Sequence, residues 1–359
     1  MSLSGTRGLV RVSKNPECHV QAAMAIERVR EPDFYRAVTG NEYPGEYGER
    51  VAARRRGHKF ESRLHENNAA GLRRVLAGVY GWDAETMAVR NFADEVPGPP
   101  TTMRAARLSR TRHILQDLRD GREVPHLLIQ PQFALPTGPG GGPGEHEYVS
   151  PDFAVLDRER KMYVPGEEKS FIVRENVAEP GDLDLTRRQA AAQILALGAE
   201  ASIVGLHDRV GNDAVFIMAT PYGMYPAPPV VEALDAEIHE MRRALTTIST
   251  VRAELEALRT TTPEAKLENL IDELPFVFRE ECLSSCILAS VCEQRYSTTA
   301  GVLGDRASTL LGAGRPLDDL GQLLTAGGSD PVEQELIRRL ESAGEVLGLN
   351  RDELARRLA

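Results

Sequence analysis

Two runs of β-favouring residues flank a short polar turn between Tyr148 and Val173, and this segment constrains the fold most. The first run ends near Leu156, the second begins at Met162, and the polar stretch Asp157 to Arg160 separates them. Two such runs joined by a few polar residues are typical of a β-hairpin. The chain is therefore expected to contain a sheet that other segments must cover.

Helical patterns lie on both sides of this hairpin. Apolar residues recur at helical spacing in most of the remaining chain. Helices are expected at residues 19–30, 49–80 (one long helix), 101–120, 183–198 (ending at Gly198), 229–259 and beyond 297. Short strands are expected at 9–12, 126–135, 201–208 and 214–222, the last two paired around Gly211-Asn212. The order of helices, sheet, helix, sheet and helices predicts an α/β or α+β chain with a mixed sheet.

Composition supports a globular, cytoplasmic protein. Apolar residues make up 42% and charged residues 27% of the 359 residues, close to average values. A run of about 18 apolar residues, which a membrane helix would need, is absent from the sequence. The first residues lack the apolar stretch of a signal peptide. We therefore expect no membrane association and a cytoplasmic location.

The charge distribution is uneven. The net charge is −10, yet Arg50 to Arg74 contains eight basic and two acidic residues. A second basic stretch runs from Arg104 to Arg122. Such blocks can bind phosphate groups locally whatever the total charge. The alternative is that both are solvated helix faces.

The hairpin carries a cluster of charges. If Leu156 pairs with Lys161, a bulge at Pro165-Gly166 brings Asp152 beside Glu167. Glu167 and Lys169 share a strand face, and Glu168 points the other way. Two carboxylates beside an ammonium group suit a site for Mg²⁺ or Mn²⁺. The alternative is an exposed hairpin decorated with salt bridges.

Three of the four cysteines, Cys282, Cys286 and Cys292, lie within eleven residues, and Cys18 lies far upstream. Clustered cysteines in a reducing compartment indicate a metal site more than a disulfide framework. Four thiolates can hold a four-iron cluster or Zn²⁺. Four buried apolar thiols are the alternative.

The order of these motifs resembles the PD-(D/E)XK nucleases, in particular the RecB-like branch. Pro151-Asp152 and Glu167-Glu168-Lys169 match the core motif. Upstream, Gly57-x-x-x-Glu61 matches the helix motif, with Glu where His is common and His58 nearby. Downstream, Gln189 matches the glutamine motif, and Gln193 replaces its usual aromatic partner.

The resemblance implies a restriction-endonuclease-like core, with a mixed central sheet flanked by helices. It implies that Asp152 and Glu167 bind Mg²⁺ or Mn²⁺, that Glu61 or His58 completes the ligand shell, and that the Glu168 carbonyl is a further ligand. Lys169 would position the attacking water, and Gln189 would steady Lys169 or the phosphate. DNA would follow the basic helix, whose predicted contacts are Arg54, Arg55, Arg56, Lys59 and Arg63.

One cysteine before this core and three after it resembles the iron–sulfur nucleases of the RecB-like class. These include the CRISPR-associated RecB-like exonucleases and the AddB nuclease domain. The first gap, Cys282-x3-Cys286, is one residue longer than is usual there. The resemblance implies that Cys18, Cys282, Cys286 and Cys292 bind a structural 4Fe-4S cluster, with zinc as the alternative.

Together these features predict a four-part chain. Residues 1–35 carry the first cysteine, 36–280 form the nuclease core with a Gly/Pro loop at 136–147, 281–296 carry the cysteine cluster, and 297–359 form a helical tail. Around Gly312-Ala313-Gly314 the tail faintly resembles a helix-hairpin-helix module, and an ordinary helical cap is the alternative.

The predicted function is that of a metal-dependent deoxyribonuclease in repair or phage defence, an exonuclease acting on single-stranded DNA or DNA ends. The sequence has no ATP-binding loop of the Walker type, so a helicase or defence-complex subunit would be a separate chain. Two alternatives remain: a non-catalytic DNA-end clamp or scaffold subunit, and a zinc-stabilised DNA-binding protein. Retention of Asp152, Glu167 and Lys169 favours the enzyme.

Overall fold

The computed structural model describes most of the chain. Its described residues are 6–43, 51–95, 100–136, 148–172, 180–220, 225–278, 282–296, 316–329, 331–346 and 348–358. Two compact units emerge from the backbone contacts. The first comprises residues 1–13, 25–28 and 45–254, and the second comprises 14–24, 29–44 and 255–359. The predicted loop at 136–147 and the Gly312-Ala313-Gly314 turn fall outside the described residues, except for Pro136.

The first unit is built on a six-stranded mixed sheet with the order β1-β2-β5-β6-β7-β8. The strands are β1 (Val89–Asn91), β2 (Leu127–Ile129), β5 (Phe153–Asp157), β6 (Met162–Ile172), β7 (Asp213–Ala219) and β8 (Val230–Ala233). The pairs β1/β2 and β6/β7 are parallel, and the other neighbours are antiparallel. The predicted hairpin is confirmed as β5 and β6. Strands β3 (Phe133–Ala134) and β4 (Tyr148–Val149) form a separate antiparallel pair.

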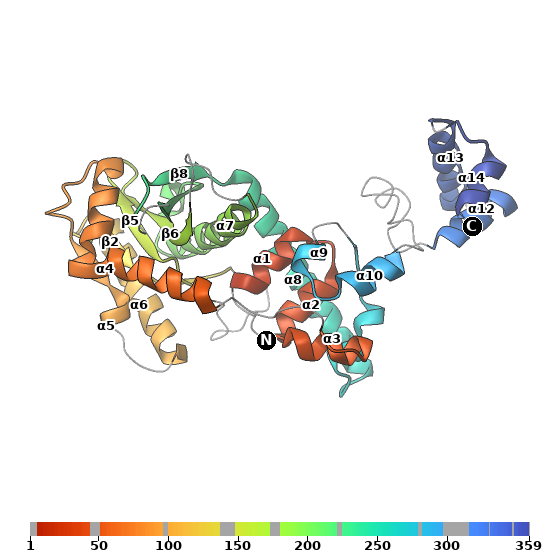
Figure 1. Cartoon of the computed structure of the whole chain (residues 1–359), viewed down its shortest axis with the longest axis horizontal. Coiled ribbons are helices and arrows are strands. Elements are labelled where there is room, and N and C mark those ends of the chain that lie inside the picture. Colours follow the sequence, from red (N-terminus) through yellow and green to blue (C-terminus); the bar gives the residue numbers. More distant parts are fainter. Residues whose placement is uncertain are drawn as a thin grey trace. The chain divides into compact units, whose positions relative to one another are not determined.

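Helices cover both faces of this sheet (Figure 1). Helix α4 (Val51–Tyr80) packs Phe60, Leu64 and Leu72 against alternate residues of β5, β6 and β7. Helix α7 (Pro180–Ile203) packs Ala190, Ala191 and Ile194 against the other face of β7. The period of two along the strands thus separates two cores, one for each helix. The predicted mixed sheet flanked by helices is confirmed.

Helix α4 is interrupted, although the sequence predicts one continuous helix. Residues Glu66 to Ala69 have non-helical backbone angles, and Asn67, Asn68 and Ala69 have positive φ. Asparagine tolerates the left-handed region better than most residues because its side chain can hydrogen-bond locally. The segment before the break carries the predicted DNA contacts and the helix motif, whereas Arg73 and Arg74 follow the break.

Several predicted elements differ from the structure. Residues 9–12 belong to helix α1 (Thr6–Lys14), and residues 201–208 include the end of α7, a turn and a short 3-10 helix at His207–Arg209. Helix α7 continues past Gly198. Strand β7 pairs with β6 and β8, so the predicted pairing around Gly211-Asn212 is wrong. Residues 230–233 form β8 before helix α8 (Asp235–Thr261), and the segment 126–135 divides between β2 and β3.

Helices and short turns make up the described part of the second unit. Two further helices of the first unit are α5 (Phe92–Glu95) and α6 (Pro100–Arg119). The other helices that the structure describes are α2 (His19–Glu27), α3 (Glu31–Thr39), α9 (Cys282–Ser285), α10 (Ala289–Tyr296), α12 (Leu317–Ala326), α13 (Pro331–Val346) and α14 (Arg351–Leu358). Two 3-10 turns lie at Leu267–Asn269 and Ile271–Glu273. Helices α12, α13 and α14 share a leucine-rich core that includes Leu320, Leu336 and Leu354. The helical tail is confirmed for the residues described, and Gly327 ends α12 with a φ of 85°.

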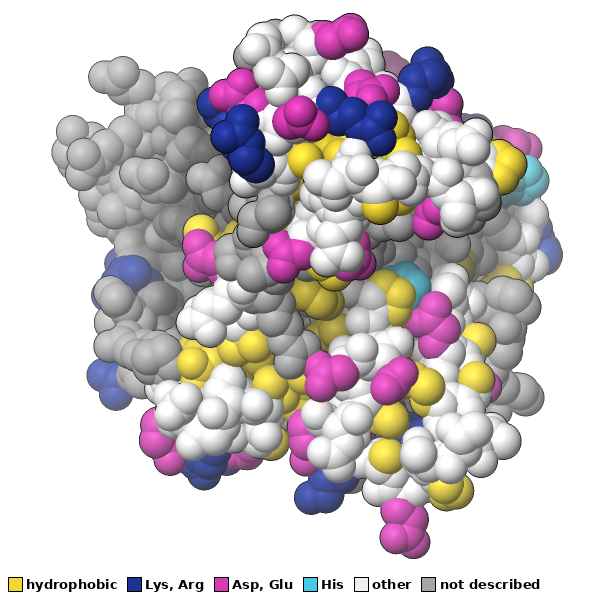
Figure 2. Space-filling model, turned by 90° about the vertical axis from the view of Figure 1, so that its right-hand side faces the viewer, with side chains coloured by type: hydrophobic (Ala, Val, Ile, Leu, Met, Phe, Trp, Pro, Cys, Tyr) yellow, Lys and Arg dark blue, Asp and Glu magenta, His cyan; other side chains and the backbone are white. Residues whose placement is uncertain are grey.

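The surface mixes charges of both signs. Figure 2 shows one face, on which acidic and basic side chains are interspersed rather than gathered by sign. Within the described part of the chain, no helix combines the length and the apolar character needed to cross a membrane.

Candidate functional site

Strand β6 presents charged residues on both of its faces. The side chains of Glu167 and Lys169 lie on the α7 face, where the Gln193 amide nitrogen donates a hydrogen bond to Glu167 Oε1. Glu168 lies on the α4 face, where its Oε1 is 2.9 Å from Nε2 of His65. The period of two therefore separates the three consecutive residues as the sequence predicts.

Asp152 joins these residues at the end of the hairpin. Its Oδ2 accepts a 2.8 Å hydrogen bond from the backbone N–H of Glu168, and Nζ of Lys169 lies 3.8 Å from the same oxygen. Lys169 also forms an ion pair with Glu167. The structure thus brings Asp152, Glu167 and Lys169 together.

The register that achieves this differs from the predicted one. Leu156 pairs with Tyr163 rather than Lys161, and Phe153 pairs with Gly166 without a bulge at Pro165-Gly166. Regular pairing continued by one residue already places Asp152 level with Glu167. The turn keeps the assumed length of four residues but lies one residue later, at 158–161, because Asp157 pairs with Met162.

Gly166 allows the strands to approach beneath the site. A Cβ at this position would lie 2.1 Å from Cζ of Phe153. The Phe153 ring is fully buried in the core that α4 covers. Any side chain at residue 166 would therefore displace the ring or the strand that carries Glu167.

Burial dominates the electrostatics of the cluster. Glu167 is 0% and Glu168 2% exposed. Burial raises the pKa of Glu167 to about 7, with a further contribution from the charge of Asp152. Burial likewise raises the pKa of Glu168 to about 7, against the lowering effect of its hydrogen bond with His65. Both carboxyl groups therefore titrate near neutral pH.

In the cationic partners, burial acts on the pKa in the opposite direction. Burial lowers the pKa of Lys169, but the charges of Glu167 and Asp152 outweigh this effect and raise the pKa above its usual value. The pKa of His65 is also raised, because its hydrogen bond with Glu168 and the nearby carboxylates outweigh burial. Lys169 thus stays protonated at neutral pH.

Helix α4 contributes two residues, and only one of them is predicted from the sequence. Burial and then the charge of Asp152 raise the pKa of Glu61, which places it within electrostatic reach of the cluster. His65 follows four residues later on the same helix face and contacts Glu168. His58, by contrast, has a side chain that is 72% exposed, and its Nδ1 lies 3.9 Å from Glu61. His65 is therefore the histidine that the fold directs toward the acidic residues.

Helix α7 also contributes a residue other than the predicted one. Gln189 is half-buried and makes no hydrogen bond to Lys169 or Glu167 within the described residues. Gln193, one turn later, is buried and donates to Glu167. The sequence assigned no role to Gln193 or His65, although each lies four residues from a predicted residue, the spacing that marks a shared helix face.

The predicted DNA contacts lie on α4. Arg55, Arg56 and Lys59 are exposed, and the side chain of Arg54 falls outside the described residues. The guanidinium carbon of Arg63 lies 5.8 Å from the ring centroid of Tyr225, within the range of a cation–π contact. Tyr225 is itself 67% exposed.

The donor chemistry of the cluster fits a hard divalent cation. Among the described residues, no three His, Cys, Asp or Glu side chains are already arranged as a set of metal ligands. The fit rests instead on an excess of acceptor oxygens. Four carboxyl groups (Glu61, Asp152, Glu167 and Glu168) interact with one lysine and two histidines, His58 and His65. Oε2 of Glu168 is buried and accepts no hydrogen bond from any described residue, and carboxylate oxygens of this kind suit Mg²⁺ or Mn²⁺.

The four cysteines lie together in the second unit and are free thiols. Cys18 and Cys282 are buried, and Cys286 and Cys292 are partly exposed. Burial raises the pKa of Cys286 well above its usual value, and the charges of Cys18, Cys292 and Cys282 add to this effect. Cys286 therefore lies within electrostatic reach of the other three cysteines. In the part of the chain that the structure describes, no three of these thiols are already arranged as a set of metal ligands.

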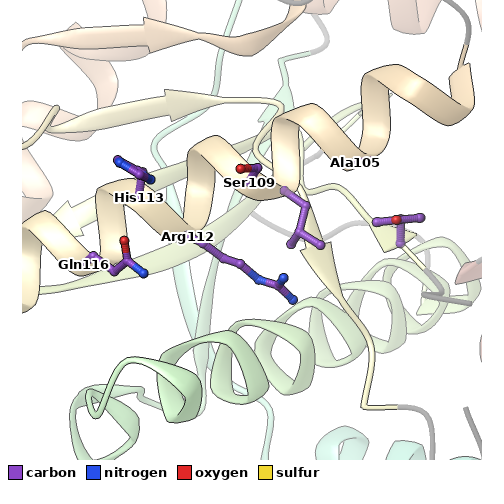
Figure 3. A pocket seen from close by; sticks show the side chains of 7 residues that line it. Ala105, Ser109, Arg112, His113 and Gln116 are labelled. Carbon is purple, nitrogen blue, oxygen red and sulfur yellow. The ribbon is translucent and has the colours of Figure 1, made fainter. Parts of the chain in front are cut away.

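A separate hollow of about 350 Å³ runs along α6 in the first unit (Figure 3). Its lining includes Ser109, Arg112, His113 and Tyr148, and none of the acidic-cluster residues. Arg112 reaches from α6 to α7, where both oxygens of the buried Glu200 accept from its guanidinium group. The arginine is thus committed to a structural ion pair.

The described fold and site define a mixed α/β protein with a buried cluster of carboxylates around a lysine at the end of a central hairpin. No family model matches the chain, and no curated protein or solved structure is significantly similar to it.

Proposed function

We propose that this chain is a metal-dependent nuclease that hydrolyses phosphodiester bonds in DNA. The observation that carries the proposal is the position of Lys169 against Glu167 and Asp152. Strand β6 lies inside the sheet between β5 and β7, and Glu167 is fully buried. An exposed hairpin decorated with salt bridges would not bury these charges, so their burial argues against that alternative.

Buried charges of this kind are costly to a fold and need a compensating role. The resemblance to PD-(D/E)XK nucleases suggests such a role, because those enzymes use these residue types in this order to bind a catalytic metal ion. Mg²⁺ or Mn²⁺ bound by Asp152, Glu167 and the α4 carboxylate would polarise the scissile phosphate and lower the pKa of a bound water. Glu61 is the α4 ligand we propose, with His65 holding Glu168 in place.

Each protein group then has a defined task. Lys169 has three N–H donors, and one of them hydrogen-bonds Glu167, while Nζ lies 3.8 Å from Oδ2 of Asp152. A remaining N–H donor would orient the attacking water or stabilise charge on a phosphate oxygen. Gln193 fixes the orientation of Glu167 by donating to it.

The basic residues of α4 support DNA as the substrate. Arg55, Arg56 and Lys59 offer contacts for phosphate groups, and Tyr225 beside Arg63 offers an aromatic face on which a base can stack. Because phosphate contacts would dominate, binding should weaken steeply with added salt. An exonuclease on single strands or DNA ends is the form we propose.

We further propose that the four cysteines hold a metal centre with a structural role, a 4Fe-4S cluster, with zinc as the alternative. The grouping of Cys18, Cys282, Cys286 and Cys292 in one compact unit supports this. Thiolates suit both metals. Anaerobic purification followed by metal analysis and visible absorption distinguishes the two.

The test of the nuclease is digestion of end-labelled single- and double-stranded DNA with Mn²⁺. Asp152→Ala and Lys169→Met should abolish cleavage while DNA binding persists. Glu159→Ala is the matched control, because Glu159 is an exposed carboxylate in the turn of the same hairpin. Binding without cleavage by the wild-type protein would favour a DNA-end clamp, and equal cleavage by Asp152→Ala would refute the proposed site.

A further inference from the structure

A tight turn in the chain ends at Cys18, the first of the four cysteines. Residues Asn15, Pro16, Glu17 and Cys18 form a turn closed by a 3.1 Å hydrogen bond from the Cys18 N–H to the Asn15 carbonyl. Asparagine at the first and proline at the second position are favoured in such turns. The backbone therefore fixes where the Asn15 side chain begins relative to Cys18.

The same turn is joined to the segment that precedes the cysteine cluster. The His19 N–H donates a 2.9 Å hydrogen bond to the Pro275 carbonyl, and Nδ2 of Asn15 donates a 2.6 Å bond to the Val277 carbonyl. The backbone of Val277 in turn hydrogen-bonds Cys18, which lowers the pKa of that thiol against the larger, raising effect of burial. Protein hydrogen bonds thus hold Cys18 against the segment that precedes the cysteine cluster.

The second N–H of the Asn15 amide points at a sulfur atom. Nδ2 of Asn15 lies 3.3 Å from Sγ of Cys282. The orientation of the amide is fixed, because a carbonyl oxygen such as that of Val277 can only accept a hydrogen bond. Asn15 is 1% exposed, and its Oδ1 has no hydrogen-bond partner among the described residues. The side chain therefore leaves its acceptor oxygen without a partner among the described residues, while its amide nitrogen serves two acceptors.

We propose that Asn15 is a positioning residue for the thiolate-bound metal centre, holding the sulfur of Cys282 in its ligand orientation and favouring the thiolate. This inference rests on the metal centre proposed above. A donor aimed at a sulfur stabilises negative charge on it, and partners of this kind tune both affinity and electronic properties of a metal site. Asn15 would thus act through Cys282 without being a ligand itself.

The test compares three forms of the full-length protein. Asn15→Leu removes both donors at similar volume. Gln21→Met is the matched control, since Gln21 is a buried amide in the same unit whose side-chain atoms have no hydrogen-bond partner in the described part of the chain. Each metal-free protein is titrated with Co²⁺ under anaerobic conditions, followed by thiolate-to-metal charge-transfer absorption, and Zn²⁺ competition then gives the affinity.

We expect Asn15→Leu to bind both ions about 10–100-fold more weakly and to shift the charge-transfer band at saturating Co²⁺. Gln21→Met should match the wild type. A parallel arm reconstitutes the proteins with ferrous iron and sulfide, where loss of the donor should make the reduction potential of the cluster more negative. Hydrogen exchange of the peptide 14–24 in the metal-free proteins reports whether the turn stays docked.

The outcomes separate the two proposals. Equal affinity and an unchanged spectrum for Asn15→Leu would overturn the role of Asn15 and leave the metal centre standing. Failure of the wild-type protein to bind any metal through its thiolates would overturn both. The nuclease proposal is tested separately at Asp152, so neither result decides it.

Discussion

Replacing Gly166 with alanine measures the energetic consequence of the close packing of Phe153 beneath the site. The added Cβ would lie 2.1, 2.3 and 2.7 Å from three atoms of the Phe153 ring. Ordinary contact begins at 3.4 Å, so the ring or the strand must move by 3.4 minus 2.1, or 1.3 Å. The ring is fully buried in the core cluster that also contains Phe60 and Leu64, and protein cores are packed too closely to take up such a movement freely. Overpacking of this kind costs about 1–3 kcal/mol, and we expect the upper half of that range.

Urea unfolding followed by the fluorescence of Trp82 measures this cost. Trp82 is the only tryptophan of the chain, and it packs against the same core and donates a 2.8 Å hydrogen bond to the Leu156 carbonyl. Gly78→Ala is the matched control, because Gly78 lies in α4 and a Cβ added there would meet nothing within 4 Å. That substitution should stabilise the protein by about 0.5–1 kcal/mol.

A double mutant shows whether the ring is the cause. Phe153→Leu alone should destabilise the protein by about 1–3 kcal/mol through loss of buried surface. In the presence of Phe153→Leu, Gly166→Ala should cost about 1 kcal/mol less than it does alone, because the two changes share one space. An unfolding midpoint for Gly166→Ala equal to that of the wild type, or strict additivity in the double mutant, would refute the reasoning.

Three further predictions concern charges in the same unit. Arg112→Met should cost about 3–5 kcal/mol in urea unfolding, because it leaves the buried Glu200 unpaired, whereas Arg119→Met at an exposed pair should cost less than about 1 kcal/mol. Burial lowers the pKa of His126, whose neutral Nδ1 accepts a hydrogen bond from the Ala88 N–H. The contribution of neutral His126 to the free energy of unfolding should therefore be lost as pH falls below 6.5. His126→Asn should flatten the dependence of stability on pH between about pH 7 and 5. The pKa values of Glu167 and Glu168 are raised to about 7, so the stability that their protonated forms contribute is present at low pH and is lost as pH rises through that value. Added Mn²⁺ should restore the urea-unfolding midpoint at about pH 8. An unchanged midpoint would contradict the proposed metal site.

Local patterns predicted the elements whose contacts are local. The hairpin could be anticipated because both of its strands and the polar turn lie within one short segment, and α6 because its apolar residues repeat at helical spacing. Residues 9–12 misled the prediction, since Leu9, Val10 and Val12 suit a strand by type but are all buried in a helix. Tertiary burial outweighs propensity there.

The pairing of distant segments could not be read from the sequence. Strand β7 pairs in parallel with β6, from Gly166 opposite Val215 to Lys169 opposite Met218, and no turn joins them to fix a register. The rotation of each helix over the sheet is equally non-local. This is why Glu61 and Gln189 were predicted from spacing, whereas the contacts of His65 and Gln193 became visible only once α4 and α7 were placed.

The central position of β6 in the sheet makes its buried acidic residues, Glu167 and Glu168, an indication of function. A strand between two neighbours, with a helix core on each face, would bury apolar residues if stability alone mattered. Here Glu167 faces one core and Glu168 the other, each almost fully buried. Their raised pKa values mean that the fold holds these carboxyl groups against a free-energy cost at neutral pH. Carboxyl groups that are buried at such a cost beside a protonated lysine mark a candidate site for chemistry on a charged substrate.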